Sequence, residues 1–390
     1  MACVFDYLDW RGDLSFKKMP FNPVDNIILS LLAYCPFDGI VPPPGTDGSV
    51  SLRNAADRLF AAIKKNPQKM NMYHFFKDAQ YRLLLAVRES VRYQDIKIAA
   101  YINHIDIHTQ IQFAACTFLP EEGFPAYLAF RGTDNSIIGW KEDFNMIFTD
   151  AIPAQLEALN YIETVSKTIK GNFNAGGHSK GGNLAVYAGA FCNSKIKKRI
   201  IQIYNNDGPG FTQKMASRPE YKEIKSKIIS YIPQDSIVGL LFENRDFCVV
   251  RSANSGFVQH NPFLWEVRRT DVSKLDTITE GSRFVNKALM DWLESMDNEH
   301  RQKFINALFE MLMSTNANSI PDLTSDWLKN VRMMLASLSQ FDKETKKMLA
   351  KTFAMLFDIV KNNFLEDIEN KYIKKGNVSK NDTLQKRKTN

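Results

Sequence analysis

The sequence predicts an α/β fold: a mainly parallel sheet flanked by helices, with extra N-terminal helices and a C-terminal helical region. Segments of strand and helix character alternate between residues 126 and 251, which is typical of a parallel sheet covered on both faces. The 390 residues are 44% hydrophobic, enough to bury a large core. No apolar run approaches the length of about eighteen residues that a membrane-spanning helix needs.

The N-terminal segment, residues 1–90, is predicted to be helical and to pack on the core. Asn22 is a suitable cap for a helix whose first residue is Pro23. A second helix is predicted from about Ser51, where apolar residues fall on one stripe, and a third over residues 75–87.

The predicted core, residues 91–270, opens with strands around residues 101–113 that have one polar face. His104, Asp106 and His108 lie on that face. Neighbours on one face of a strand are about 6.5 Å apart, too far for all three side chains to bind one small ion easily. We therefore interpret them as facing solvent and predict no metal. No phosphate-binding or dinucleotide motif occurs in a suitable context, so no cofactor is predicted.

The rest of the core is predicted to alternate helix and strand. The expected strands are residues 126–130, 172–177, 200–204, 228–232 and 247–251, and the expected helices are 153–170 and 183–192.

One stretch in this alternation predicts a nucleophile. The motif Gly177-x-Ser179-x-Gly181 falls between a predicted strand and a predicted helix. This is the nucleophile-elbow pattern, in which a serine occupies a sharp turn and the glycines allow close approach of neighbouring backbone. Ser179 is therefore the predicted catalytic serine.

A serine needs a base, and His260 is the predicted one. Only two histidines follow Ser179. His300 lies in a charged helical stretch, where a solvated side chain is the simpler interpretation. His260 lies in a loop just after the last predicted strand of the sheet, where the base of such a site belongs.

Two aspartates compete for the role of orienting His260. Asp207 and Asp235 both follow predicted strands. The acid commonly comes two strands after the nucleophile strand, and Asp235 satisfies that count. Asp207, between Asn and Gly, has a ready explanation as a turn former. We therefore predict Asp235.

An oxyanion hole is predicted from Lys180 and Thr133. The backbone N–H of Lys180 directly follows the serine at a helix start, and Thr133 lies at a strand end, where its N–H and hydroxyl are both candidate donors. The Lys180 ammonium has two interpretations: it stands near the developing negative charge or an anionic head group, or it faces solvent.

The C-terminal part divides into a helical region, residues 271–370, and a tail, residues 371–390. The helical region is a candidate cap over the site. The tail contains seven Lys/Arg and one acid, and we expect it to be disordered. A solubilising end is the simpler interpretation, and contact with an anionic membrane is the alternative. No specific nucleic-acid partner is predicted.

The five cysteines form no CxxC pair, and the N-terminus lacks the pattern of a signal peptide. Free thiols and this start predict a cytoplasmic protein.

Several longer motifs resemble known families. Residues 129–133 with Trp140, Asp143 and the sequence Gly177-His178-Ser179 resemble the class 3 lipases. Residues 5–13, 21–25, 177–185, 205–211 and 259–262 resemble the Mbeg1-like family of α/β-hydrolases. This resemblance extends over about residues 1–270 and implies an α/β-hydrolase fold with Ser179, Asp235 and His260 as its triad. Lys180 departs from the apolar residue that is usual after the serine of lipases.

Together these observations predict a serine hydrolase that cleaves an acyl-lipid or small acyl ester. Thioester or amide cleavage by the same triad is one alternative. A non-catalytic hydrolase-fold scaffold, which binds a partner through the C-terminal region or the tail, is the other.

Overall fold

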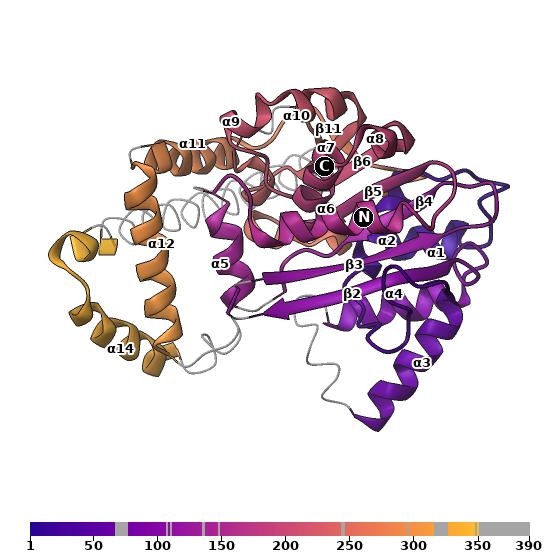
Figure 1. Ribbon diagram of the computed structural model, residues 1–390, viewed down its shortest axis with the longest axis horizontal. Helices are drawn as coiled ribbons and strands as arrows, with labels where there is room; N and C mark the ends of the chain where they lie inside the picture. The colour runs from indigo at the N-terminus through magenta and orange to yellow at the C-terminus, as the bar shows by residue number, and fades with distance from the viewer. Residues whose placement is uncertain are drawn as a thin grey trace, which may run out of the picture.

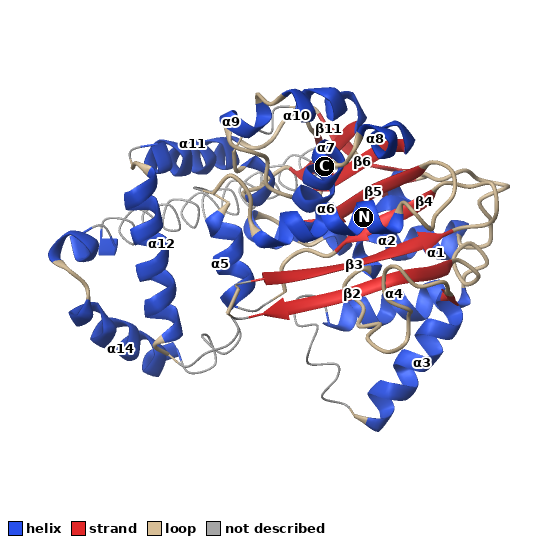
Figure 2. Ribbon diagram, viewed as in Figure 1, coloured by secondary structure: helices blue, strands red, loops and turns tan. Residues whose placement is uncertain are grey.

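The computed structural model describes residues 1–66, 77–106, 108–109, 111–134, 137–146, 149–242, 246–294, 296–315, 327–347 and 349–350. Its centre is a sheet with helices on both faces, so the chain has an α/β fold arranged like an α/β-hydrolase (Figures 1 and 2). The tail 371–390 and the end of the predicted helical region, residues 351–370, lie outside the described residues.

In the described chain, nine strands form this sheet in the order β1-β2-β3-β4-β5-β6-β7-β8-β11. Strands β4 to β8 run parallel, as the alternation predicts, and antiparallel strands extend both edges. The strands are β1 (Val50–Ser51), β2 (Lys97–Asp106), β3 (Ile111–Leu119), β4 (Ala126–Phe130), β5 (Phe173–His178), β6 (Ile200–Asn206), β7 (Ile228–Pro233), β8 (Cys248–Val250) and β11 (Lys274–Leu275). A separate hairpin joins β9 (Val267–Arg268) to β10 (Asp271–Val272).

The N-terminal helices cover one face of the sheet. They are α1 (Val4–Arg11), α2 (Pro23–Leu32), α3 (Leu52–Lys65) and α4 (Lys77–Glu89). Asn22 caps α2 as predicted, because its side chain accepts from the N–H groups of Val24 and Asp25. The predicted helix over residues 75–87 corresponds to α4, and its first residues lie outside the described part.

The other face is covered by helices from the middle of the chain. They are α5 (Ile137–Asn145), α6 (Pro153–Val165), α7 (Lys180–Phe191), α8 (Ser194–Arg199), α9 (Gln213–Ala216) and α10 (Pro219–Ile224). Alternate residues of β4 point into opposite cores: Tyr127 contacts the core under α1 to α4, and Leu128 contacts the core under α6 and α7. Burial on both faces explains why β4 appears in the sequence as an unbroken apolar run.

The C-terminal helices extend to one side of the sheet, beyond α5 (Figure 1). They are α11 (Glu280–Glu294), α12 (Asn298–Met313) and α14 (Trp327–Ser337). The rings of Phe309 in α12 and Phe144 in α5 pack 5.8 Å apart. No helix of the described segments is long and apolar enough to cross a membrane. The predicted boundaries at residues 90, 270 and 370, and the capping role of this region, stay predictions.

Candidate active site

Ser179 occupies a sharp turn between β5 and α7. Its backbone has φ 58° and ψ −134°, a region that non-glycine residues seldom adopt and that costs about 1–3 kcal/mol. The turn is fixed by two hydrogen bonds, from Ser179 N to Asn206 O (2.9 Å) and from Gly182 N to Ser179 O (2.9 Å). This geometry is that of a nucleophile elbow.

The glycines of the motif allow the elbow to pack against β4. A Cβ atom on Gly177 would overlap the backbone of Gly181 and the carbonyl of Phe130, and a Cβ on Gly181 would overlap that same carbonyl. Both glycines are therefore required by close backbone contact, as the motif predicts.

His260 ends the 3₁₀ turn η4 (Gly256–His260), which follows β8. Its Nδ1 lies 2.7 Å from Oδ2 of Asp207. A carboxylate only accepts hydrogen bonds, so Nδ1 carries the proton and Nε2 is the basic nitrogen of the neutral ring. The ring also packs 4.5 Å, centroid to centroid, from that of His178, the residue before Ser179.

The carboxylate that pairs with His260 is thus that of Asp207, not that of the predicted Asp235. Asp207 directly follows β6, adopts φ 51° and is buried. Its Oδ1 accepts from Ser236 Oγ (2.5 Å) and Gly239 N (3.2 Å), and Oδ2 pairs with His260. Burial raises the pKa of Asp207, and these hydrogen bonds oppose the shift.

Asp235 instead braces the turn that carries His260. Its carboxylate accepts from Gly256 N (3.1 Å), Gln259 Nε2 (2.7 Å) and Thr279 Oγ1 (2.6 Å). These bonds hold the 3₁₀ turn that carries His260. The strand count predicts Asp235 because its strand, β7, is the second after β5, whereas the carboxylate that pairs with His260 follows the adjacent strand β6.

His178 is a further site residue that the sequence reasoning did not assign. Its Nε2 lies 2.7 Å from the carbonyl of His260, so Nε2 donates, and Nδ1 accepts from Tyr34 Oη at 3.0 Å. Burial lowers the pKa of His178 well below its usual value, with His260 adding to the shift. The neutral ring therefore links the end of β5 to the backbone of the proposed base.

The predicted oxyanion residues, Lys180 and Thr133, belong to two segments next to Ser179: the start of α7 and the loop after β4. Lys180 is the first residue of α7, where backbone N–H groups have no partner within the helix. The loop after β4 lies alongside, because a Cβ on Gly132 would come within 3.0 Å of Ser179 Cβ. The Thr133 hydroxyl donates to Asp143 in α5, so the backbone N–H remains the candidate donor of Thr133.

The Lys180 ammonium matches neither interpretation of the sequence. It neither stands at the site nor faces solvent: Nζ lies 2.8 Å from Oε2 of Glu142, and both side chains are fully buried. The His300 ring is partly exposed at the start of α12, where it pairs at 2.8 Å with Asp297, the N-cap residue. Across the described segments, no group of three His, Cys, Asp or Glu side chains is arranged to hold a metal ion.

The model of the Mbeg1-like family matches residues 87–310, more than half of the chain. The chain belongs to the Mbeg1-like family. No curated protein matches the sequence.

Every candidate residue of this Mbeg1-like chain, from Thr133 to His260, lies within the matched region. One signal for the acid was therefore already visible in the sequence, because the motif at residues 205–211 that resembles the family contains Asp207. Asp207 can form the turn and also orient His260, because the turn directs its carboxylate toward the imidazole.

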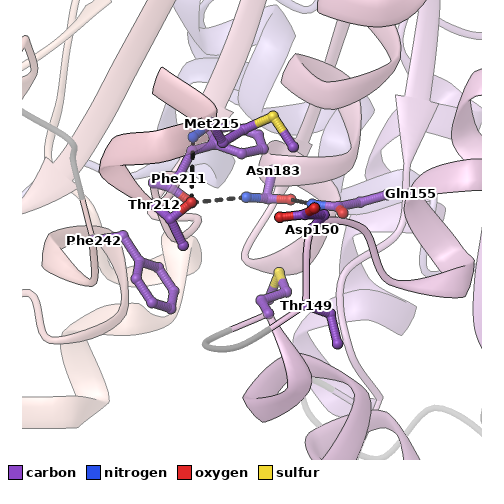
Figure 3. A pocket seen from close by; sticks show the side chains of 10 residues that line it. Thr149, Asp150, Gln155, Asn183, Phe211, Thr212, Met215 and Phe242 are labelled. Carbon is purple, nitrogen blue, oxygen red and sulfur yellow. Dashed lines mark hydrogen bonds between the residues drawn. The ribbon is translucent and has the colours of Figure 1, made fainter. Parts of the chain in front are cut away.

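A pocket lies one helical turn beyond Ser179 along α7 (Figure 3). Its empty volume is about 270 Å³, part of it open to solvent. Asn183 forms its inner wall and is held by Gln155 Nε2 (2.7 Å) and by the carbonyl of Gly210 (3.0 Å). The lining is mixed: four apolar side chains face the pocket together with the polar side chains of Thr149, Asp150 and Thr212. The apolar ones are those of Met146, Phe211, Met215 and Phe242.

Proposed function

We propose that this Mbeg1-like protein is a serine hydrolase that cleaves carboxylic esters by acyl transfer. The observation that carries the proposal is the pairing of His260 with buried Asp207, beside the elbow that bears Ser179. A nucleophile, a base and an orienting acid are the three groups that this chemistry requires.

In the first half-reaction, Ser179 Oγ bonds to the ester carbonyl carbon while His260 Nε2 takes the hydroxyl proton. The oxyanion is stabilised by the backbone N–H groups of Lys180 and Thr133. When the bond to the alkoxy oxygen breaks, His260 returns the proton to the leaving alcohol. Asp207 stabilises the imidazolium throughout.

In the second half-reaction, water replaces the alcohol. His260 takes a proton from the water, whose oxygen bonds to the acyl carbon. The bond to Ser179 then breaks, and the proton restores its hydroxyl. The four apolar side chains of the pocket near Asn183 offer a contact surface for an acyl group of the substrate.

The test is hydrolysis of p-nitrophenyl acetate, butyrate and octanoate. We expect turnover by the wild type, with kcat/KM rising from acetate to at least butyrate. Ser179→Ala should lower kcat by about 10⁴-fold or more. Ser217→Ala, at an exposed serine of the same chain, is the matched control and should retain full activity. No turnover of any ester by folded wild-type protein would favour the non-catalytic scaffold instead.

A further inference from the structure

The side chain of Lys180 occupies an unusual environment for an ammonium. Its Nζ donates to Gln112 Oε1 (2.7 Å), Gln112 O (3.0 Å) and Glu142 Oε2 (2.8 Å), and lies 3.4 Å from Asp143 Oδ1. The three donors of the ammonium are therefore all used by β3 and α5. Burial lowers the pKa of Lys180, but the charges of Glu142 and Asp143 outweigh it and raise the pKa overall.

A buried ion pair at this position is not explained by stability. Replacing such a pair with apolar residues is often neutral or stabilising, because desolvation offsets the attraction between the charges. A cation in the first turn of a helix is also unfavourable to the helix dipole. Lys180 carries both disadvantages directly after the proposed nucleophile. A lysine at this position is therefore better explained by a need to hold its neighbours in a fixed arrangement than by stability.

Two chains of contacts lead from the ammonium to the loop that faces Ser179. In one, Asp143 lies beside Nζ and accepts a hydrogen bond from the Thr133 hydroxyl. In the other, Gln112 accepts from Nζ and its own amide reaches Gly132 O at 3.5 Å. Residues Gly132 and Thr133 are thus linked to the side chain of the residue that directly follows Ser179.

We propose that the Lys180 side chain is a positioning group for the oxyanion hole, setting the Gly132–Thr133 loop against the start of α7 through Asp143 and Gln112. One residue then supplies one oxyanion donor from its backbone and places the second with its side chain. The inference rests on the proposed hydrolase function and deepens it.

The first test compares Lys180→Met with the wild type in p-nitrophenyl butyrate hydrolysis. We expect kcat to fall about 100-fold with little change in KM, because a displaced donor weakens transition-state binding more than substrate binding. Lys180→Met leaves Glu142 without its cation, so Lys180→Met with Glu142→Gln provides a second variant with neutral partners. The same loss of kcat is expected there.

The matched control is the ion pair of Arg92 with Asp25, which is equally buried, at 2.6 Å, among the N-terminal helices. Arg92→Met should lower thermal stability without changing kcat per folded molecule. A loss of kcat in Arg92→Met as large as in Lys180→Met would show that a general loosening explains both, and would overturn the inference.

Coupling through Asp143 gives a second readout. Asp143→Asn keeps an acceptor for Thr133 but removes the charge beside Lys180. If Lys180 acts through Asp143, the kcat of the double variant Lys180→Met with Asp143→Asn should be no lower than that of the less active single variant. Multiplied losses would contradict this route.

The pH profile supplies a third readout. Burial raises the pKa of Asp143 to about 6, and the Lys180 charge opposes that rise. Glu142 and Tyr34 also face Asp143. We therefore expect kcat to fall as the pH drops through about 6, and this limb to move to higher pH in Lys180→Met. Stability changes oppositely: because the folded pKa exceeds the ordinary 3.8, the Asp143 contribution is present at low pH and lost as the pH rises through about 6.

Failure of the inference differs from failure of the proposed function. A wild type without turnover removes the function and the inference with it. If the wild type hydrolyses the ester and the folded Lys180→Met and double-variant proteins have the same kcat, the inference alone is overturned.

Discussion

Asp207 shows how one backbone conformation can direct a carboxylate toward the proposed base. With φ 51°, the residue turns the chain sharply after β6 and directs its carboxylate toward the turn that carries His260. Ser236 and Gly239 occupy Oδ1, so that Oδ2 is presented to the imidazole. The surrounding donors offset part of the cost of burying the charge.

The roles assigned to the two aspartates can be separated by substitution. Asp207→Asn should lower kcat for p-nitrophenyl butyrate by about 10⁴-fold, because the amide no longer fixes the reactive tautomer of His260. Asp235→Asn should lower kcat by less than about tenfold, since the neutral side chain still has an acceptor for the η4 turn. An equal loss in Asp235→Asn would contradict the assignment.

Residue chemistry was only partly visible in the sequence. Ser179 and His260 followed from motif and chain order, and the structure places them in contacting segments. The acid was missed because a strand count cannot show which strand end faces the base. The role of the Lys180 side chain was missed because its partners Gln112 and Glu142 lie far away in sequence, so only the packing of β3, α5 and α7 brings the charges together.

At the scale of elements, the contact between the end of β4 and the start of α7 determines how closely the loop after β4 approaches Ser179. Gly181 lies in the first turn of α7, and a Cβ there would overlap the Phe130 carbonyl. This contact brings the loop after β4 alongside Ser179, so the elbow and the Gly132–Thr133 loop pack directly against each other.

Alanine at two glycines of α7 tests that contact. Gly181→Ala should lower the free energy of unfolding by about 3 kcal/mol, because a backbone carbonyl cannot move aside. Gly189→Ala is the matched control on the same helix: its Cβ would come closest to Cδ1 at the end of the Ile203 side chain, which unlike a backbone carbonyl can rotate aside. That substitution should change stability by less than about 1 kcal/mol, as measured by urea unfolding. Similar losses at both positions would contradict the packing argument.

The long elements were predictable because a buried face makes apolar residues recur at regular intervals in the sequence. Strands β4 to β8 lie within a few residues of their predicted positions. The strands at the edges, β1 and β11, contain two residues each, too few for any period. Helix α5 was missed because Glu142 and Asp143 interrupt its apolar face, and their partner is a cation in another helix.

For the whole molecule, the helices before and after the core both reach the site. Tyr34, which follows α2, contacts His178. From the other end, Ser282 in α11 donates to the carbonyl of Ser236, whose hydroxyl binds Asp207. The site is therefore built from three regions of the chain, which the alternation pattern of the core alone does not reveal.

Covalent labelling of Ser179 tests the central claim most directly. Folded wild-type protein is treated with a fluorophosphonate, and the product is examined by intact-mass measurement and peptide mapping, beside a serine esterase that confirms the reagent. We predict one adduct, on Ser179, that is absent from Ser179→Ala and forms far more slowly in Asp207→Asn. An unlabelled wild type, or an adduct on another residue, would contradict the account.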